Sequence, residues 1–118
     1  NLHKAAKALY LNKRFPQTTV ELLEYPGFGP YTARAVATFS FNEKVGVLDG
    51  NVIRLLSRYY GLKVQHWLPK GRLALQERAD ALAQTSEAAT LNQALIELGA
   101  TICTPQSPSC LLCPWVKN

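Results

Sequence analysis

The chain has 118 residues, of which 47% are hydrophobic and 18% are charged, a length and composition typical of one domain with a modest core. No apolar run approaches the roughly 18 residues of a membrane span, and residues 1–6 do not resemble a signal peptide, so an intracellular protein is expected. The formal net charge of +5 comes from residues 1–63, which carry nine Lys/Arg and four acids, because residues 64–118 carry four of each. This asymmetry favours a polyanionic partner, although a solvated basic surface explains it about equally well.

Helix patterns and one tight turn account for the first 41 residues. Three segments predict helices: residues 1–12, residues 18–24 and residues 30–41. The second begins with a capping box at Thr18 and Glu21. The run Pro26-Gly27-Phe28-Gly29 predicts a tight turn before the third, because glycine readily takes positive φ. Pro30 is well placed as a first helical residue. The outline is that of a helix-hairpin-helix.

The rest of the chain predicts more helices and no strand of consequence. Residues 42–47 predict a loop, and Asp49 is a suitable N-cap for a helix over residues 50–60, which Gly61 closes. Residues 62–71 predict a linker, and residues 72–84 and 89–100 predict two further helices. A Pro- and Ser-rich tail is expected from residue 103 onward. The fold class is therefore predicted to be all-α.

The glycine turn is a candidate phosphate site. Backbone N–H groups at a turn leading into a helix point at one place and carry partial positive charge, and such contacts position a duplex without reading its sequence. A Pro-Gly-x-Gly run alone also fits an ordinary turn between helices. With the basic half around it, the pattern favours phosphate binding by Pro26-Gly27-Phe28-Gly29. Arg34 and Arg54 are candidate DNA contacts or, as readily, surface residues.

Two roles fit Asp49. An aspartate before a helix is a common cap, and taken alone this interpretation is the stronger one. A carboxylate also stabilises positive charge on a sugar ring during glycosidic cleavage, which passes through an oxocarbenium-like state. Such chemistry usually needs a second acid to protonate the leaving group, and no other carboxylate is an obvious partner. Tyr31 fits either a core aromatic or a pocket residue, and Asn51 either extends the cap or contacts a phosphate.

All three cysteines lie in the tail, with the spacing Cys103-x6-Cys110-x2-Cys113 and a proline after the last. An odd number of cysteines in an intracellular protein is not a disulfide pattern. Close thiols separated by prolines are typical of metal or iron–sulfur ligation, with buried free cysteines as the weaker interpretation. Zinc needs a fourth ligand, and His3 and His66 are remote in sequence.

Together these residues resemble a known family. The glycine hairpin, the acid eighteen residues after Tyr31 in Leu48-Asp49-Gly50-Asn51-Val52, and the cysteine spacing are similar to those of the helix-hairpin-helix DNA glycosylases related to endonuclease III. Within that superfamily the likeness is greatest to the adenine DNA glycosylases, on residues 1–6, on Asp49-Gly50-Asn51-Val52 and on residues 92–104. The resemblance covers nearly the whole chain.

The resemblance implies a base-excision repair enzyme that flips adenine mispaired with 8-oxoguanine out of double-stranded DNA and hydrolyses its N-glycosidic bond. It implies that Asp49 stabilises the sugar cation or bonds to it transiently, and that Tyr31 and Asn51 assist it. Relatives with a lyase step carry a lysine at the position of Tyr31, so a monofunctional enzyme is expected. Three ligands of a [4Fe-4S] cluster are implied: Cys103, Cys110 and Cys113.

The resemblance also implies groups outside this segment. In the family, the fourth cysteine of the loop would occupy the position after Asn118. The acid that protonates adenine and the side chain that wedges into the duplex come from preceding helices, and a C-terminal domain senses oxidised guanine. We therefore expect residues 1–63 to form part of the helical barrel with the hairpin and Asp49, and residues 64–118 to form a second lobe that ends in the iron–sulfur loop. The segment by itself is expected to have little activity.

The expected partner is double-stranded DNA with a mismatch, bound by a monomer in the cytoplasm or nucleoid of a bacterium, or in the nucleus or mitochondrion of a eukaryote. Two alternatives stay open. A thymine-mismatch DNA glycosylase of the same superfamily can also carry tyrosine after the hairpin, although Asp49-Gly50-Asn51-Val52 favours the adenine type. A non-catalytic helix-hairpin-helix module would use the glycine turn to hold phosphate and Asp49 only as a cap.

Overall fold

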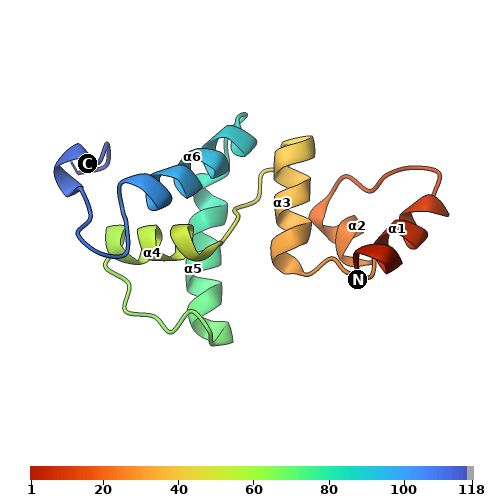
Figure 1. Ribbon diagram of the computed structural model, residues 1–118, viewed down its shortest axis with the longest axis horizontal. Coiled ribbons are helices and arrows are strands. Elements are labelled where there is room, and N and C mark those ends of the chain that lie inside the picture. The colour runs from red at the N-terminus through yellow and green to blue at the C-terminus, as the bar shows by residue number, and fades with distance from the viewer. Residues whose placement is uncertain (117–118) are drawn as a thin grey trace.

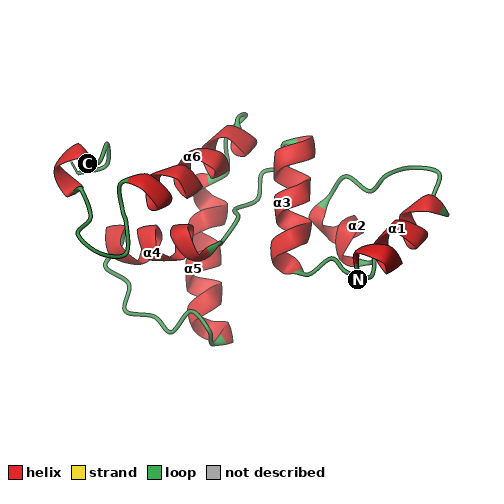
Figure 2. Cartoon of the chain, in the orientation of Figure 1, coloured by secondary structure: helices red, strands yellow, loops and turns green. Residues whose placement is uncertain are grey.

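A computed structural model describes residues 1–116, which form helices joined by loops (Figures 1 and 2). The α-helices are Leu2–Tyr10 (α1), Thr19–Leu23 (α2), Pro30–Phe41 (α3), Gly50–Tyr59 (α4), Pro69–Leu82 (α5) and Ala88–Thr101 (α6), and Cys110–Leu112 forms a short 3-10 helix (η1). No strand occurs in residues 1–116, so the predicted all-α class is confirmed. None of the helices in this part of the chain is long and apolar enough to cross a membrane.

Side-chain caps begin two of the helices. The Thr18 hydroxyl accepts a hydrogen bond from the Glu21 N–H of α2 at 3.2 Å, and the Asp49 carboxylate accepts one from the Val52 N–H of α4 at 2.8 Å. These oxygens satisfy N–H groups that have no partner inside their own helices. Both predicted caps are therefore confirmed. α4 ends beside Gly61, whose φ of +63° favours glycine, as expected for the residue after a helix.

The helix expected over residues 72–84 begins earlier and runs from Pro69 to Leu82. Pro69 occupies the first turn, where the N–H that proline lacks would have no helical acceptor. Gly71 also lies in this turn, and a Cβ on it would collide with the Gln65 carbonyl. The glycine that the sequence pattern places in a linker therefore allows α5 to pack closely against the preceding loop.

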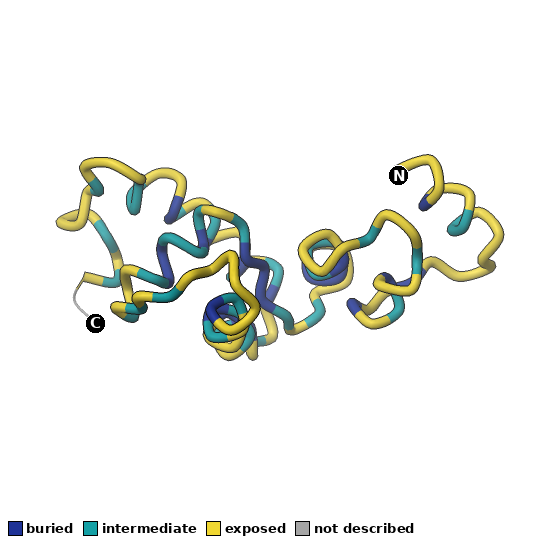
Figure 3. Tube along the Cα trace, turned by 90° about the horizontal axis from the view of Figure 1, so that it is seen from below, coloured by how far each residue is buried: buried dark blue, intermediate teal, exposed yellow. Residues whose placement is uncertain are grey.

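The helices form two groups with separate hydrophobic clusters. α1, α2 and α3 lie at one end of the molecule, and α4, α5 and α6 lie at the other (Figure 1). Buried residues occur in both groups (Figure 3). The first cluster consists of Leu22, Ala33 and Ala37. The second consists of Leu48, Val52, Leu55, Leu56, Leu75, Ala79 and Leu95. α3 also contacts α6, so the two groups touch.

The change from one group to the other occurs in the loop of residues 42–49 rather than at residue 63. The sequence predicts that α4 belongs with the hairpin in residues 1–63, but α4 packs against α5 and α6. The reason is its apolar face, since Val52, Leu55 and Leu56 are buried in the second cluster. Asp49 therefore lies at the junction between the two groups.

Candidate active site

The predicted glycine turn connects α2 to α3. Ala33 N–H donates to the Gly29 carbonyl at 2.9 Å, so the hydrogen bonds of α3 begin at Gly29. No side chain caps this helix, and no backbone acceptor in residues 1–116 takes up the N–H groups of Gly29, Tyr31 or Thr32. Gly29 and Pro30 are exposed. The turn therefore presents N–H donors and a positive helix end to solvent, an arrangement that suits an anion.

The two glycines of the turn differ in what they do for the fold. Gly27 has a φ of +88°, and a Cβ on it would lie 2.9 Å from the Asn1 carbonyl oxygen, so the backbone itself favours glycine there. Gly29 has an extended backbone, with φ of −82° and ψ of 176°, and a Cβ on it would have no other atom within 4 Å. Folding therefore does not require glycine at residue 29, and a side chain on it would extend into open space.

Asp49 is the N-cap of α4, and both of its carboxylate oxygens are engaged. Oδ1 accepts a hydrogen bond from the Val52 N–H at 2.8 Å, and Oδ2 accepts one from the Asn51 side-chain amide at 3.2 Å. The two residues before it, Val47 and Leu48, are only 1% and 3% exposed, whereas Asp49 is half-buried. The carboxylate is thus fixed at the edge of the second cluster.

A series of hydrogen bonds connects Asp49 to the start of the cysteine tail. Asn51 Oδ1 accepts from Arg54 Nη2 at 3.0 Å. The same guanidinium donates to the carbonyls of Gly99 at 2.6 Å and Cys103 at 2.8 Å. Glycine at residue 99 allows α6 to approach α4 this closely, because a Cβ there would lie 2.7 Å from the Asn51 carbonyl oxygen. Asn51 is therefore held between Asp49 and Arg54, and the Arg54 guanidinium is used by internal acceptors.

Tyr31 and Arg34 lie on α3 in different surroundings. Tyr31 is 43% exposed, and no hydrogen bond within residues 1–116 joins it to Asp49. Arg34 Nη1 lies 2.7 Å from the Asp80 carboxylate of α5. The structure therefore brings Asp49 and Asn51 together, leaves Tyr31 open to solvent and engages Arg34 between the two groups. DNA contacts by Arg34 and Arg54 stay predictions.

Two carboxylates that precede Asp49 in the sequence are engaged at α2. Glu43 Oε2 accepts from the Thr19 N–H at 2.7 Å and so supplies a second cap for this helix. Glu21 pairs with Arg14 at 2.8 Å. Their contacts indicate a structural role for both side chains.

The three cysteines line one cavity beside α4. Cys103, Cys110 and Cys113 surround about 270 Å³ together with Arg58 and Trp115, and all three thiols are free. Arg58 donates to the carbonyls of Thr104 at 2.7 Å and Pro105 at 2.9 Å, in the loop after Cys103. The donor type and the shared location fit an iron–sulfur cluster. The geometry is incomplete, because in residues 1–116 no three His, Cys, Asp or Glu side chains converge closely enough to hold a metal ion.

Sequence patterns do not single out two polar residues of the junction, Asp80 and Asn92. Asn92 is 1% exposed and belongs to the buried face of α6 together with Ala88, Leu95 and Gly99. A polar side chain on a buried stripe needs a hydrogen-bond partner, so its position in the stripe is the signal that could have identified it. Asp80 gives no such signal, since it occupies an ordinary polar position of a helix.

The chain is similar in sequence to adenine DNA glycosylases, although no protein-family model matches it. It is 44% identical to the adenine DNA glycosylase of Arabidopsis thaliana over 103 residues, which are 85% of this chain and 16% of that protein. It is 36% identical to the adenine DNA glycosylase of Buchnera aphidicola subsp. Baizongia pistaciae over 117 residues, which are 97% of this chain and 32% of that protein.

A solved structure of a thermostable thymine-DNA glycosylase has a similar fold, with a TM-score of 0.77 and 30% identity over 98% of this chain and 54% of that chain. The present chain thus spans about a third or less of these curated relatives and about half of the solved chain. The resemblance predicted from the motifs is confirmed, as is a partial helix-hairpin-helix DNA glycosylase fold.

Proposed function

We propose that this chain, which its sequence relates to the adenine DNA glycosylases, is the segment of such an enzyme that holds the DNA backbone and stabilises the sugar cation. The whole enzyme would remove adenine mispaired with 8-oxoguanine by hydrolysis of the N-glycosidic bond, acting as a monomer on double-stranded DNA. The observation that carries the proposal is the fixed carboxylate of Asp49, in a chain with 44% identity to an adenine DNA glycosylase.

The proposed chemistry depends on charge. As the bond between the base and the sugar breaks, positive charge develops on the sugar ring, and a carboxylate held in place stabilises it. The Val52 N–H and the Asn51 amide each hold one oxygen of Asp49, so the group does not have to be ordered during the reaction. The departing adenine takes its proton from an acid in another part of the enzyme. Tyr31 has no amine to form an imine, which fits a monofunctional enzyme.

The hairpin is proposed to hold a phosphate. The N–H groups of Gly29, Tyr31 and Thr32 have no backbone acceptor in the described residues, and a Cβ on Gly29 would extend into open space. A phosphate oxygen would accept hydrogen bonds from these donors without any contact to a base. This mode of binding explains why the turn carries glycine at a position where folding does not need it.

We also propose that Cys103, Cys110 and Cys113 supply three ligands of a [4Fe-4S] cluster, with a fourth cysteine from outside the described residues. When bound, the cluster would supply a covalent tie between the tail and α6, since only Ile102 separates Cys103 from the end of that helix. Purified protein should be brown, with broad absorbance near 400 nm and iron in metal analysis. A colourless protein containing zinc would contradict this part of the proposal.

The thymine-mismatch alternative has one observation in its favour, the similarity to the solved thymine-DNA glycosylase. Sequence identity favours the adenine type, at 44% against 30%. The non-catalytic alternative treats Asp49 only as a helix cap.

Substitution of Asp49 by asparagine in the full-length protein separates catalysis from capping. Asparagine caps helices as well as aspartate does and loses only the hydrogen bond from the Asn51 amide, so the free energy of unfolding should fall by no more than about 1 kcal/mol. The charge that opposes the sugar cation is removed, so adenine release under single-turnover conditions should fall by at least about a hundredfold, with duplex affinity retained. Release at the wild-type rate with normal binding would show that Asp49 is only a cap.

A further inference from the structure

The loop of residues 42–49 connects the hairpin to the helix that Asp49 begins. It contains no helix or strand, so its shape is not fixed by regular backbone hydrogen bonds. If the hairpin holds the DNA and Asp49 faces the sugar, the position of one relative to the other depends on what holds this loop. A positioning role for the residues that hold it therefore rests on the proposed function.

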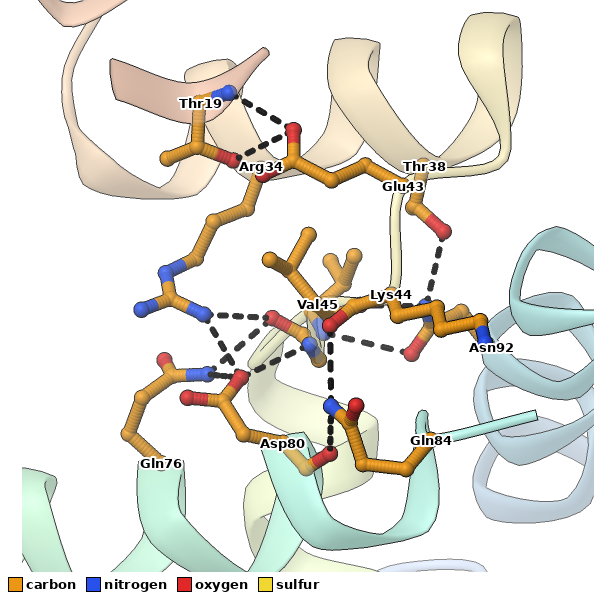
Figure 4. Close-up of polar contacts among 12 residues, drawn as sticks. Thr19, Arg34, Thr38, Glu43, Lys44, Val45, Gln76, Asp80, Gln84 and Asn92 are labelled. Carbon is orange, nitrogen blue, oxygen red and sulfur yellow. Dashed lines mark hydrogen bonds and ion pairs between the residues drawn. The ribbon is translucent and has the colours of Figure 1, made fainter.

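On one side the loop is held by α5 (Figure 4). Asp80 Oδ1 accepts hydrogen bonds from the Gly46 N–H at 2.8 Å, from Arg34 Nη1 at 2.7 Å and from Gln76 Nε2 at 3.0 Å. The Gln76 amide also donates to the Gly46 carbonyl at 3.0 Å. A Cβ on Gly46 would lie only 2.5 Å from Ala79, so the loop rests directly on the helix. One carboxylate thus joins α3, the loop and α5.

On the other side the loop is held by α6. Asn92 Oδ1 accepts from the Val47 N–H at 3.3 Å, and its Nδ2 donates to the Val45 carbonyl at 2.8 Å and to the Thr38 hydroxyl at 3.1 Å. Asn92 is 1% exposed, so water does not compete for these bonds. One amide thus joins α3, the loop and α6, as Figure 4 shows.

We propose that Asp80 and Asn92 are positioning residues for Asp49. Asp80 fixes the backbone at Gly46, and Asn92 fixes it on both sides of that residue. Only the buried Val47 and Leu48 lie between Gly46 and Asp49. Both also bind α3, the helix that follows the glycine turn. The same two side chains therefore set the distance between the hairpin, which is proposed to bind DNA, and Asp49, which is proposed to stabilise the sugar cation.

The size of the expected effect follows from the sensitivity of such sites to geometry. A displacement of about 1 Å in a catalytic group costs up to about a hundredfold in rate, whereas DNA held by the hairpin does not sense the position of Asp49. Loss of the junction should therefore lower the rate of the chemical step and leave DNA affinity nearly unchanged. A purely stabilising role would lower neither of these in protein that is still folded.

Asp80 is the better residue for the test, because its side chain is 36% exposed and its replacement leaves no buried hole, unlike that of Asn92. The variants are Asp80→Ala and Asp80→Asn in the full-length protein with matched metal content. The asparagine side-chain oxygen still accepts a hydrogen bond from the Gly46 N–H, so this variant is the conservative rescue. The control is Glu21→Ala, which removes an ion pair of 2.8 Å whose carboxylate is 38% exposed.

Adenine release is measured in a single turnover, duplex affinity by fluorescence anisotropy, and amide hydrogen exchange at Gly46 and Val47 by mass spectrometry or NMR. We expect Asp80→Ala to slow release by about tenfold to a hundredfold, with affinity within about threefold of wild type and faster exchange at both amides. Asp80→Asn should recover most of the rate, and Glu21→Ala should match wild type. An unchanged rate in Asp80→Ala, a parallel loss of rate and affinity, or an Asp80→Asn variant as slow as Asp80→Ala would overturn the proposal.

Failure of the proposed function gives a different pattern. If the wild-type protein releases no adenine from any duplex, that function is wrong, and the exchange data decide the role of the junction. Faster exchange at Gly46 and Val47 in Asp80→Ala, absent in Glu21→Ala, supports a loop held by Asp80. Equal exchange in all variants overturns it.

Discussion

Replacement of Gly29 by alanine should weaken DNA binding without weakening the fold. The backbone of Gly29 is extended and no atom lies within 4 Å of a Cβ placed there, so the methyl group meets nothing in the protein. Alanine gains about 0.4–1 kcal/mol from a less flexible unfolded chain and loses a similar amount as a poorer N-cap. The free energy of unfolding should therefore stay within about 0.5 kcal/mol of wild type.

The same methyl group would sit on the residue that begins the run of free N–H groups, and it would take up space that an approaching phosphate needs. Loss of one hydrogen bond to a charged phosphate costs about 1.5–3 kcal/mol, which corresponds to about a tenfold to hundredfold rise in Kd. The dependence of Kd on salt should keep its slope, because no Lys or Arg has been removed. Fluorescence anisotropy with a labelled duplex, over a series of salt concentrations, measures both quantities in the full-length protein.

Gly27→Ala and Gly61→Ala are the matched comparisons. Both residues have positive φ, so each variant should lose about 1–2 kcal/mol of stability in thermal or urea unfolding, and Gly27→Ala should lose more than Gly61→Ala because its Cβ would also press against the Asn1 carbonyl. Gly61 lies outside the hairpin, so Gly61→Ala should bind DNA as wild type does. If Gly29→Ala binds with the wild-type Kd, or loses affinity only in proportion to lost stability, the hairpin does not hold phosphate as proposed.

Three further predictions concern the connection between Asp49 and the tail. Arg54→Met keeps an aliphatic side chain but leaves three acceptors without the guanidinium donor. The free energy of unfolding should therefore drop by about 2–4 kcal/mol in urea titrations, and a stability equal to wild type would refute the assigned contacts. Gly99→Ala should push against Asn51 and slow single-turnover base release more than it raises the Kd for duplex; a selective rise in Kd would contradict this. Cys110→Ser should reduce bound iron and the absorbance near 400 nm, and full iron content would remove this thiol from the proposed ligand set.

Features set by neighbouring residues were predictable from the sequence. The caps at Thr18 and Asp49 depend on residues three positions apart, whereas the start of α3 at Pro30 and the glycine after α4 depend on single residues, and each of these features is confirmed. Most helix ends moved by one or two residues, and the largest shift is three residues at the start of α5, where Gly71 packs against the preceding loop in a contact that no local pattern reveals.

Features set by distant residues were not predictable in the same way. Asn92 and Val47 are 45 positions apart, Arg34 and Asp80 are 46 apart, and Arg54 reaches Cys103 over 49. Such contacts follow from how the helices pack. The sequence therefore identified Asp49 as a candidate catalytic residue but could not show what holds it in place. It also predicted DNA contacts for Arg34 and Arg54, whose guanidinium groups donate hydrogen bonds to acceptors within the protein.

The most direct test of the proposed function is to identify the base that the full-length protein releases. Duplexes containing adenine opposite 8-oxoguanine, adenine opposite guanine, or thymine opposite guanine are incubated with excess enzyme, and the free base is measured by chromatography. We predict release of adenine, fastest from the 8-oxoguanine pair, and no release of thymine. Release of thymine would assign the chain to the thymine-mismatch type, and release of no base from any of the three duplexes would contradict the enzymatic function itself.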